Sequence, residues 1–222
     1  MAHLARRTAL TTAFAVALAV PLAACSTSND ATGTSTAAAK GDEGADAKTT
    51  VPDGYTTAQI PNSSVTFAVP SDWTTLTSDD ADADDRIDAF AQATGADADS
   101  VKLKLTAYGV ISAGRGGSGK ADEINAQVNK DQNELRTKEE ITAGMEEFGI
   151  GQDDVEVAST TTGSGAEART VSYSLSFGGQ TQYGAIINAL VPKDGGTLVV
   201  TVTSYESAQR AQELLDAVAG SI

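Results

Sequence analysis

A glycine-rich stretch in the middle of the chain has the spacing of a loop that could bind phosphate. The residues from Gly114 to Lys120 read Gly-Arg-Gly-Gly-Ser-Gly-Lys, which fits the pattern G-x-x-x-x-G-K. Such a loop needs Ser or Thr after the lysine to hold Mg²⁺, and a helix whose first amides face the phosphates. Here Ala121 follows, and the next residues alternate as a strand does. We therefore interpret the stretch as a hairpin-like connection and not as a nucleotide site.

Acidic residues at alternate positions could begin a calcium loop. Asp80, Asp82 and Asp84 start as an EF-hand loop starts. However, Asp85 takes the sixth position, where the turn needs glycine, and Ala91 takes the twelfth, where a bidentate glutamate belongs. We interpret these acids as residues at the positively charged N-terminus of a helix. We expect no metal site and no organic cofactor.

The only cysteine follows a segment with the layout of a secretory signal. Arg6 and Arg7 supply positive charge, and residues 8–20 form an apolar run of about a dozen residues. That run is too short to span a bilayer, which needs about 20 apolar residues. The residues directly before the cysteine resemble a bacterial lipobox: Leu22, Ala23, Ala24 and then Cys25.

The lipobox resemblance implies a lipid anchor. In proteins with this motif the cysteine sulfur receives a diacylglyceryl group, the signal is cut before the cysteine, and the new amino terminus is commonly acylated, for example with palmitate. Residues 1–24 would then be a signal peptide, and Cys25 would hold the protein at the extracytoplasmic face of the cell membrane. Two or more acyl chains give durable anchoring. The alternative is an ordinary cleaved signal followed by an incidental free cysteine.

Composition excludes several kinds of chemistry once that signal is removed. The only histidine is His3, so a mature chain of 198 residues has none. Histidine-based triads and zinc sites are therefore excluded, and an acylated Cys25 leaves no thiolate nucleophile or ligand. Loss of Arg6 and Arg7 takes the formal charge from −15 to −17. Such acidity argues against nucleic acid as a partner, because phosphates need clustered Lys and Arg.

No other catalytic group stands out, so we expect no catalytic residue. Ser164 lies in Gly-Ser-Gly, which lacks the full nucleophile-elbow pattern. Thirty Asp and Glu residues make some pair of carboxylates inevitable, yet no spacing singles one out. A carboxylate-based hydrolase or a lipid-transfer factor with an unrecognised site stays open as the alternative to a non-catalytic module. We expect Trp73, Tyr173 and Tyr183 to be core residues and not a ligand platform.

The remainder of the chain divides into a tether and one globular domain. Residues 25–50 contain no aromatic and no branched aliphatic residue, which is typical of a flexible tether. Residues 51–222 have the length of a single domain. Period-2 alternation predicts strands at 65–69, 110–112, 124–129, 155–157, 171–177, 183–191 and 198–203, and helical spacing predicts helices at 82–94, 137–148 and 208–222. The alternation over 171–177 places Phe177 on the buried face.

One segment fits both kinds of element. Residues 97–108 have apolar residues at helical spacing and also at strand spacing. We favour a helix, because Asp97 can cap it and Gly109 can end it. With sequential strand hairpins and helices between and after them, the pattern predicts an α+β domain, an antiparallel sheet with helices packed on its faces.

The order of these elements resembles a known fold. The early strand and turn Phe67-Ala68-Val69-Pro70-Ser71-Asp72-Trp73, the asparagine-rich strand 125–129, the capped helix, the three-strand meander and the closing helix after residues 201–204 are similar to the PsbP-like α/β/α sandwich, and within it to LpqN/LpqT-type lipoproteins of actinobacteria. The resemblance implies an envelope lipoprotein with an accessory or binding role, and it brings no catalytic residues. We expect a non-catalytic module that binds an envelope protein, a glycan or a lipid.

Overall fold

The computed structural model describes residues 49–116, 118–191 and 193–222. Leu22, Ala23, Ala24, Cys25 and nearly all of the predicted tether lie outside the described residues. Thr50, near the start of the first described range, lies beside the C-terminal segment, because its N–H donates to the carbonyl of Gly220 at 3.1 Å. No helix among the described residues is long and apolar enough to cross a membrane.

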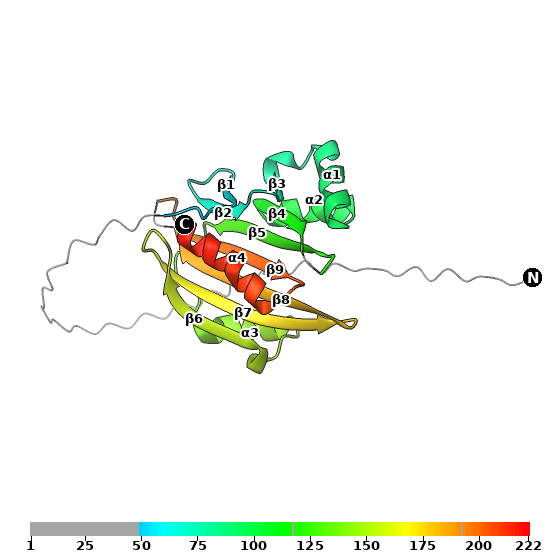
Figure 1. Cartoon of the computed structure of the whole chain (residues 1–222). Helices are drawn as coiled ribbons and strands as arrows, with labels where there is room; N and C mark the ends of the chain where they lie inside the picture. Colours follow the sequence, from blue (N-terminus) through cyan, green and yellow to red (C-terminus); the bar gives the residue numbers. More distant parts are fainter. Residues whose placement is uncertain (1–48, 117, 192) are drawn as a thin grey trace, which may run out of the picture.

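The centre of the domain is an antiparallel sheet of seven strands in the order β3-β4-β5-β9-β8-β7-β6 (Figure 1). A separate hairpin pairs β1 with β2. The strands are β1 (Tyr55–Gln59), β2 (Thr66–Pro70), β3 (Thr74–Thr77), β4 (Val110–Arg115), β5 (Ala121–Asn129), β6 (Val155–Thr161), β7 (Glu167–Phe177), β8 (Gln180–Leu190) and β9 (Thr197–Ser204).

Four α-helices pack on this sheet, so the predicted α+β class is confirmed. They are α1 (Asp84–Thr94), α2 (Ala98–Ala107), α3 (Lys138–Glu147) and α4 (Ala208–Ser221). The ambiguous segment 97–108 is helical, and the Asp97 side chain caps it by accepting from the Ser100 N–H at 2.8 Å. The α3 start also follows the prediction, since Thr137 and Glu140 form a capping box.

One face of the sheet is covered by α4 together with the β1–β2 hairpin (Figure 1). Alternate residues of β5, β8 and β9 meet Leu214, Leu215 and Val218 of α4 here and form the main core. Phe67 of β2 is fully buried in it. The hairpin is tied to the helix because the Ser221 hydroxyl accepts from the Ala68 N–H at 2.8 Å.

The opposite face is covered only at its two sides. There α1 and α2 pack on β3 and β4 around Ile111, while α3 packs near β6 to β8 around Val171 and Ile186. The register places these residues in one cross-strand row, Ile111–Asn125–Thr201–Ile186–Val171, so both helical groups lie on the same face. Between them the strands β5 and β9 carry mostly polar side chains.

Glycines with positive φ end one helix and form one hairpin. Gly95 ends α1 with φ of 75°, in the left-handed region, as a C-cap glycine does. Gly178 and Gly179 both have positive φ, 61° and 80°, which is the geometry of a tight hairpin between β7 and β8.

The prediction for Phe177 was wrong. Its side chain is 78% exposed. The reason is that β6 pairs with β7 only as far as Tyr173, so the last four residues of β7 extend past β6 with β8 as their sole paired neighbour in the sheet. Alternation in the sequence identifies the face of a strand but not whether another layer covers that face.

Smaller differences concern the ends of elements. The first helix begins at Asp84 and not at Asp82. The strands β1 and β3 had not been predicted. Both are short, and their threonines hide the period-2 pattern.

Candidate binding site

The glycine-rich stretch connects two strands, as predicted. Gly114 and Arg115 end β4, Gly116 donates its N–H to the Lys120 carbonyl at 2.9 Å, and β5 begins at Ala121. The middle glycine, residue 117, lies outside the described residues. A strand therefore stands where a phosphate loop needs a helix.

The aspartates of the EF-hand-like run make separate interactions and do not converge on one point. Asp80 accepts from the Thr77 N–H at 2.8 Å and forms an ion pair with Arg86. Asp84 pairs with Lys102 at 2.7 Å, and Asp82 is exposed. Among the residues that the structure describes, no group of three or more Asp, Glu, His or Cys could hold a metal ion.

The remaining candidates from the sequence lie apart from one another. Ser164 is in the β6–β7 turn, where its N–H donates to the Ile222 carbonyl at 2.8 Å and its hydroxyl lies 2.9 Å from that of Thr162. Trp73 and Tyr183 are partly buried against the core below α4. Tyr173 is partly buried on the opposite face, so the expectation that these three are core residues holds only in part.

The strip of the second face that lies between the two groups of helices is the best candidate for a binding site, and we call it the central trough. Its floor consists of Glu123, Asn125 and Gln127 on β5 and of Val199, Thr201 and Thr203 on β9, which pair directly across the two strands. Of these, Asn125 is 6% exposed, and the others are partly exposed. Helix α2 borders the strip on one side and α3 on the other.

An ion pair fixes the α2 side of the central trough. The Lys104 ammonium lies 2.5 Å and 2.7 Å from the two oxygens of the Glu123 carboxylate. Both side chains are largely buried, at 15% and 17% exposure. The Asn125 Nδ2 donates to the same carboxylate at 2.7 Å, which fixes the orientation of the amide. The charge of Glu123 is therefore matched within the site.

Two tyrosines from different elements lie near this ion pair, and a third lies near both of them. Tyr108 follows α2, Tyr205 follows β9, and Tyr173 reaches across from β7. Burial, followed by the Glu123 charge, raises the pKa of Tyr108 and of Tyr205. Burial, followed by the effect of the other two tyrosines, raises the pKa of Tyr173 to about 12. All three phenols are therefore neutral at pH 7.

Two buried polar atoms on this face make no hydrogen bond within the described part of the chain. They are Oδ1 of Asn125 on β5 and Nη1 of Arg169 on β7. The strand register places the two residues on the same face in adjacent cross-strand rows. Arg169 pairs with Asn188, Asn188 with Val199, and Val199 with Gln127, which is two residues from Asn125 on β5. One atom is an acceptor and the other a donor, and nearly all buried polar atoms in proteins have a partner.

A hollow of about 270 Å³ adjoins one end of the central trough. Tyr108 and Gln127 belong to both, and the hollow continues past Gly109 to Lys130 and to Ile60 beside the β1–β2 hairpin. Its lining mixes amide, hydroxyl, ammonium and apolar groups. The central trough is thus extended by open space along β5.

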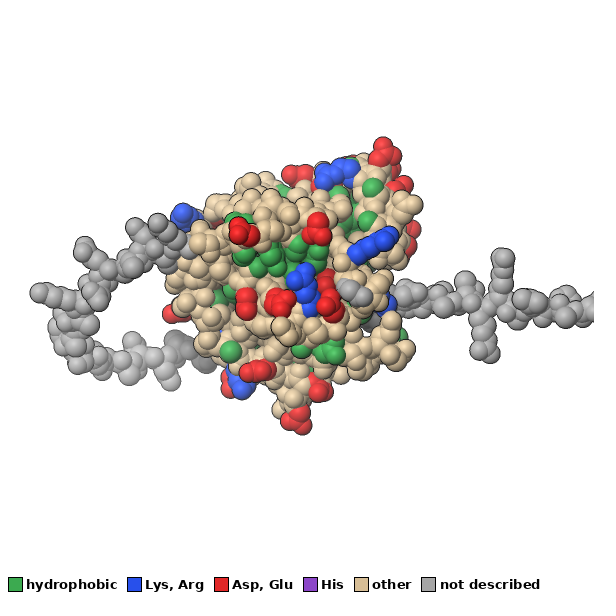
Figure 2. Space-filling view, viewed as in Figure 1, with side chains coloured by type: hydrophobic (Ala, Val, Ile, Leu, Met, Phe, Trp, Pro, Cys, Tyr) green, Lys and Arg blue, Asp and Glu red, His purple; other side chains and the backbone are tan. Residues whose placement is uncertain are grey.

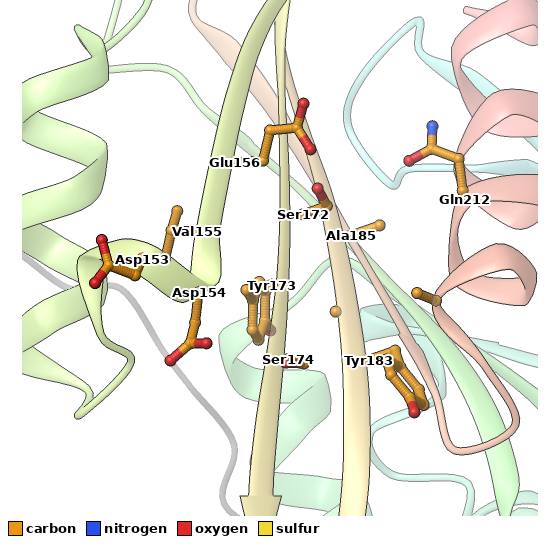
Figure 3. A pocket seen from close by; sticks show the side chains of 12 residues that line it. Asp153, Asp154, Val155, Glu156, Ser172, Tyr173, Ser174, Tyr183, Ala185 and Gln212 are labelled. Atoms are coloured by element: carbon orange, nitrogen blue, oxygen red, sulfur yellow. The ribbon is translucent and has the colours of Figure 1, made fainter.

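A second hollow, of about 330 Å³, lies where β6 begins. Figure 3 shows Glu156 and Ser172 on the side of the strands that faces Gln212 of α4, with Asp153 on the other side. Acidic side chains are scattered over the α4 face, with a few basic ones among them (Figure 2). Neither Asn125 nor Arg169 lines this hollow or the one beside Gln127.

Comparisons with known proteins add little to this geometry. No protein-family model matches the chain, and no curated protein matches it. Among solved structures, a protein of unknown function from Pseudomonas aeruginosa, described as a candidate regulator, is similar over 72% of this chain and 88% of its own, with 8% identity and a TM-score of 0.35. A similarity this weak transfers no function.

Sequence reasoning did not identify the central trough. The strand of Glu123, Asn125 and Gln127 was predicted, but alternating polar residues on a strand are also the ordinary signature of a solvent-facing side. Lys104 comes from the helix that precedes β4, whereas Tyr205 is far away in the sequence and only the strand order brings it near Glu123. The signal available in the sequence was the unusual content of amides on β5.

Proposed function

We propose that this protein is a lipid-anchored, extracytoplasmic binding module and that the central trough is its binding surface. The anchor rests on the lipobox residues Leu22 to Cys25, and we propose on the same basis that the chain is an envelope lipoprotein of the LpqN/LpqT type with a PsbP-like domain. The envelope component that it binds would be recognised by hydrogen bonding. No nucleic acid partner is proposed, because the chain has a formal charge of −15.

The observation that carries the proposal is the orphaned acceptor of Asn125. A buried acceptor without a partner costs about 1–3 kcal/mol. Asn125 is buried on the floor of the strip between two helices, next to a fixed ion pair. This oxygen is buried beneath neighbouring side chains, so a ligand that moves them aside and donates a hydrogen bond to it recovers the lost interaction.

The same groups are poorly suited to catalysis. The Glu123 carboxylate is paired with Lys104, and the tyrosines have pKa values raised above the ordinary value, so neither offers a ready base near pH 7. Lipid carriage would need a deep apolar cavity. Both hollows described above carry polar and charged residues in their walls. The binding role is therefore favoured over the hydrolase and lipid-transfer alternatives.

Site-specific photocrosslinking in the native envelope tests the proposal. A photoreactive residue replaces Gln127 in the central trough or, as the control, Ser176 on the exposed end of β7. We expect a discrete adduct from position 127 that is lost when Asn125→Ala is added. Equal adducts from both positions, or an adduct at 127 that Asn125→Ala leaves unchanged, would rule out the central trough as the binding surface.

A further inference from the structure

We infer that the ligand of the central trough is a neutral oligosaccharide that lies across the strands from β5 towards β7. This inference rests on the proposed function, because it names the chemical class that the same surface takes.

The two orphaned atoms require opposite hydrogen-bonding partners. Oδ1 of Asn125 needs a donor, whereas Nη1 of Arg169 needs an acceptor. A metal cation or an ammonium ligand would satisfy only the asparagine, and a phosphate or carboxylate only the arginine. A hydroxyl group donates and accepts, so a polyhydroxylated ligand satisfies both.

The charges on this face favour a ligand without net charge. Glu123 is matched by Lys104 at 2.5 Å. Arg169 lies near the first turn of α3, where its positive charge contributes to lowering the pKa of Glu140, after the hydrogen bonds from Thr137. Glu123 therefore has its opposite charge in direct contact, and Arg169 has a carboxylate within electrostatic reach. An anionic ligand would also meet a chain with a formal charge of −15.

Tyrosines and amides are the side chains that suit a sugar. A sugar ring has C–H faces that pack on an aromatic ring and hydroxyls at its edge that bond to polar groups, and tyrosine has an apolar body with a polar tip. Tyr173 and Tyr205 supply partly exposed rings of this kind, and Gln127 and Asn188 supply partly exposed amides. Thr201 adds a hydroxyl between them.

The separation of the strands that carry the orphaned atoms indicates the length of the ligand. Asn125 is on β5 and Arg169 on β7, with β9 and β8 between them. Three strand spacings place the backbones of these two residues roughly 14 Å apart. A ligand that extends over this distance is longer than one sugar ring, so we infer a chain of several rings.

Titration calorimetry with the full chain in detergent tests the inference against neutral oligosaccharides of increasing length and acidic oligosaccharides of matched length. We expect the affinity for neutral oligosaccharides to rise with length until both orphaned atoms are reached and then to level off. Asn125→Ala and Arg169→Met should each weaken binding about tenfold. Tyr183→Ala, on the opposite face, is the matched control and should change affinity less than twofold.

Thermal unfolding of each variant shows whether it is folded, and Gln127→Ala, at a partly exposed position, replaces any variant that is not. Binding of acidic oligosaccharides alone, or an equal loss in Tyr183→Ala, would overturn the inference. If no neutral oligosaccharide binds while the crosslink from position 127 persists, the ligand is not a neutral oligosaccharide and the proposed function stands. If the crosslink is absent as well, both fail.

Discussion

The ring of Tyr173 lies directly over the backbone of Gly184, its cross-strand neighbour on β8. A Cβ placed on Gly184 would be 2.0 Å from Cζ of the tyrosine, so the absence of a side chain is what lets the ring lie across β8 towards the central trough. Glycine inside a strand often marks such a close approach. The position of Tyr173 in the site therefore depends on the residue opposite.

Gly184→Ala should displace the Tyr173 ring and destabilise the protein by about 1–3 kcal/mol, as overpacking does. Chemical denaturation measures the change. The matched control is Gly220→Ala in α4, where an added Cβ meets nothing within 4 Å and where alanine should be neutral or slightly stabilising. Equal stability of the wild type and Gly184→Ala would show that the ring does not occupy this position.

Exposure of Phe177 predicts that the protein tolerates its loss. Because the side chain is 78% exposed at the end of β7, Phe177→Ala should change the free energy of unfolding by less than about 0.5 kcal/mol. Phe67→Ala is the comparison, since Phe67 is fully buried and its loss should cost about 3–5 kcal/mol. A large cost for Phe177→Ala in denaturant titrations would mean that the β7–β8 end packs against another part of the chain.

The contrast between these two phenylalanines shows what could be read from the sequence. Capping residues such as Thr137, and glycines such as Gly95, act locally, so the helix ends they define were predicted well. Phe177 continued a correct alternation, but its burial depended on how far β6 extends, which is a property of pairing between distant segments. Local sequence patterns thus predict where helices and strands lie and which face a side chain points to, but not whether another layer covers that face.

The candidate site could not be predicted for the same reason. Glu123 meets Lys104 across a strand–helix contact, and it meets Tyr205 only because β9 inserts beside β5. The orphaned oxygen of Asn125 has no signature in the sequence at all. By contrast, the correct rejection of the phosphate loop needed only Ala121 and the alternation after it.

The pKa of Tyr173 predicts a loss of stability at high pH. Its folded-state value of about 12 lies above the ordinary value of 10.0, so the protonated phenol stabilises the fold. This contribution is complete below pH 10 and is lost as the pH rises towards 12, with a total of about 2–3 kcal/mol. Denaturation across this range should show a steeper loss for the wild type than for Tyr173→Phe. Identical slopes would contradict the burial of the phenol.

Lipidation of Cys25 is a separate prediction from the sequence. We expect the mature protein to begin at Cys25 and to carry acyl chains, which mass spectrometry of the amino-terminal peptide would detect. Cys25→Ala should release a folded domain from the membrane, because the described core involves residues from Thr50 onwards. An unmodified cysteine, or cleavage at another residue, would contradict the predicted lipid anchor.

Nuclear magnetic resonance of the full chain during titration with a neutral oligosaccharide tests the central claim most directly. The side-chain amide of Asn125 donates to Glu123 and carries the orphaned oxygen, so its resonances report on the floor of the central trough. We predict that the largest shifts occur at this amide, at Gln127 and at the ring of Tyr205; Tyr173 lines the hollow beside α4 as well and does not distinguish the two sites. Shifts centred instead on Glu156 and Gln212 beside α4, or no shifts at saturating oligosaccharide, would contradict the account.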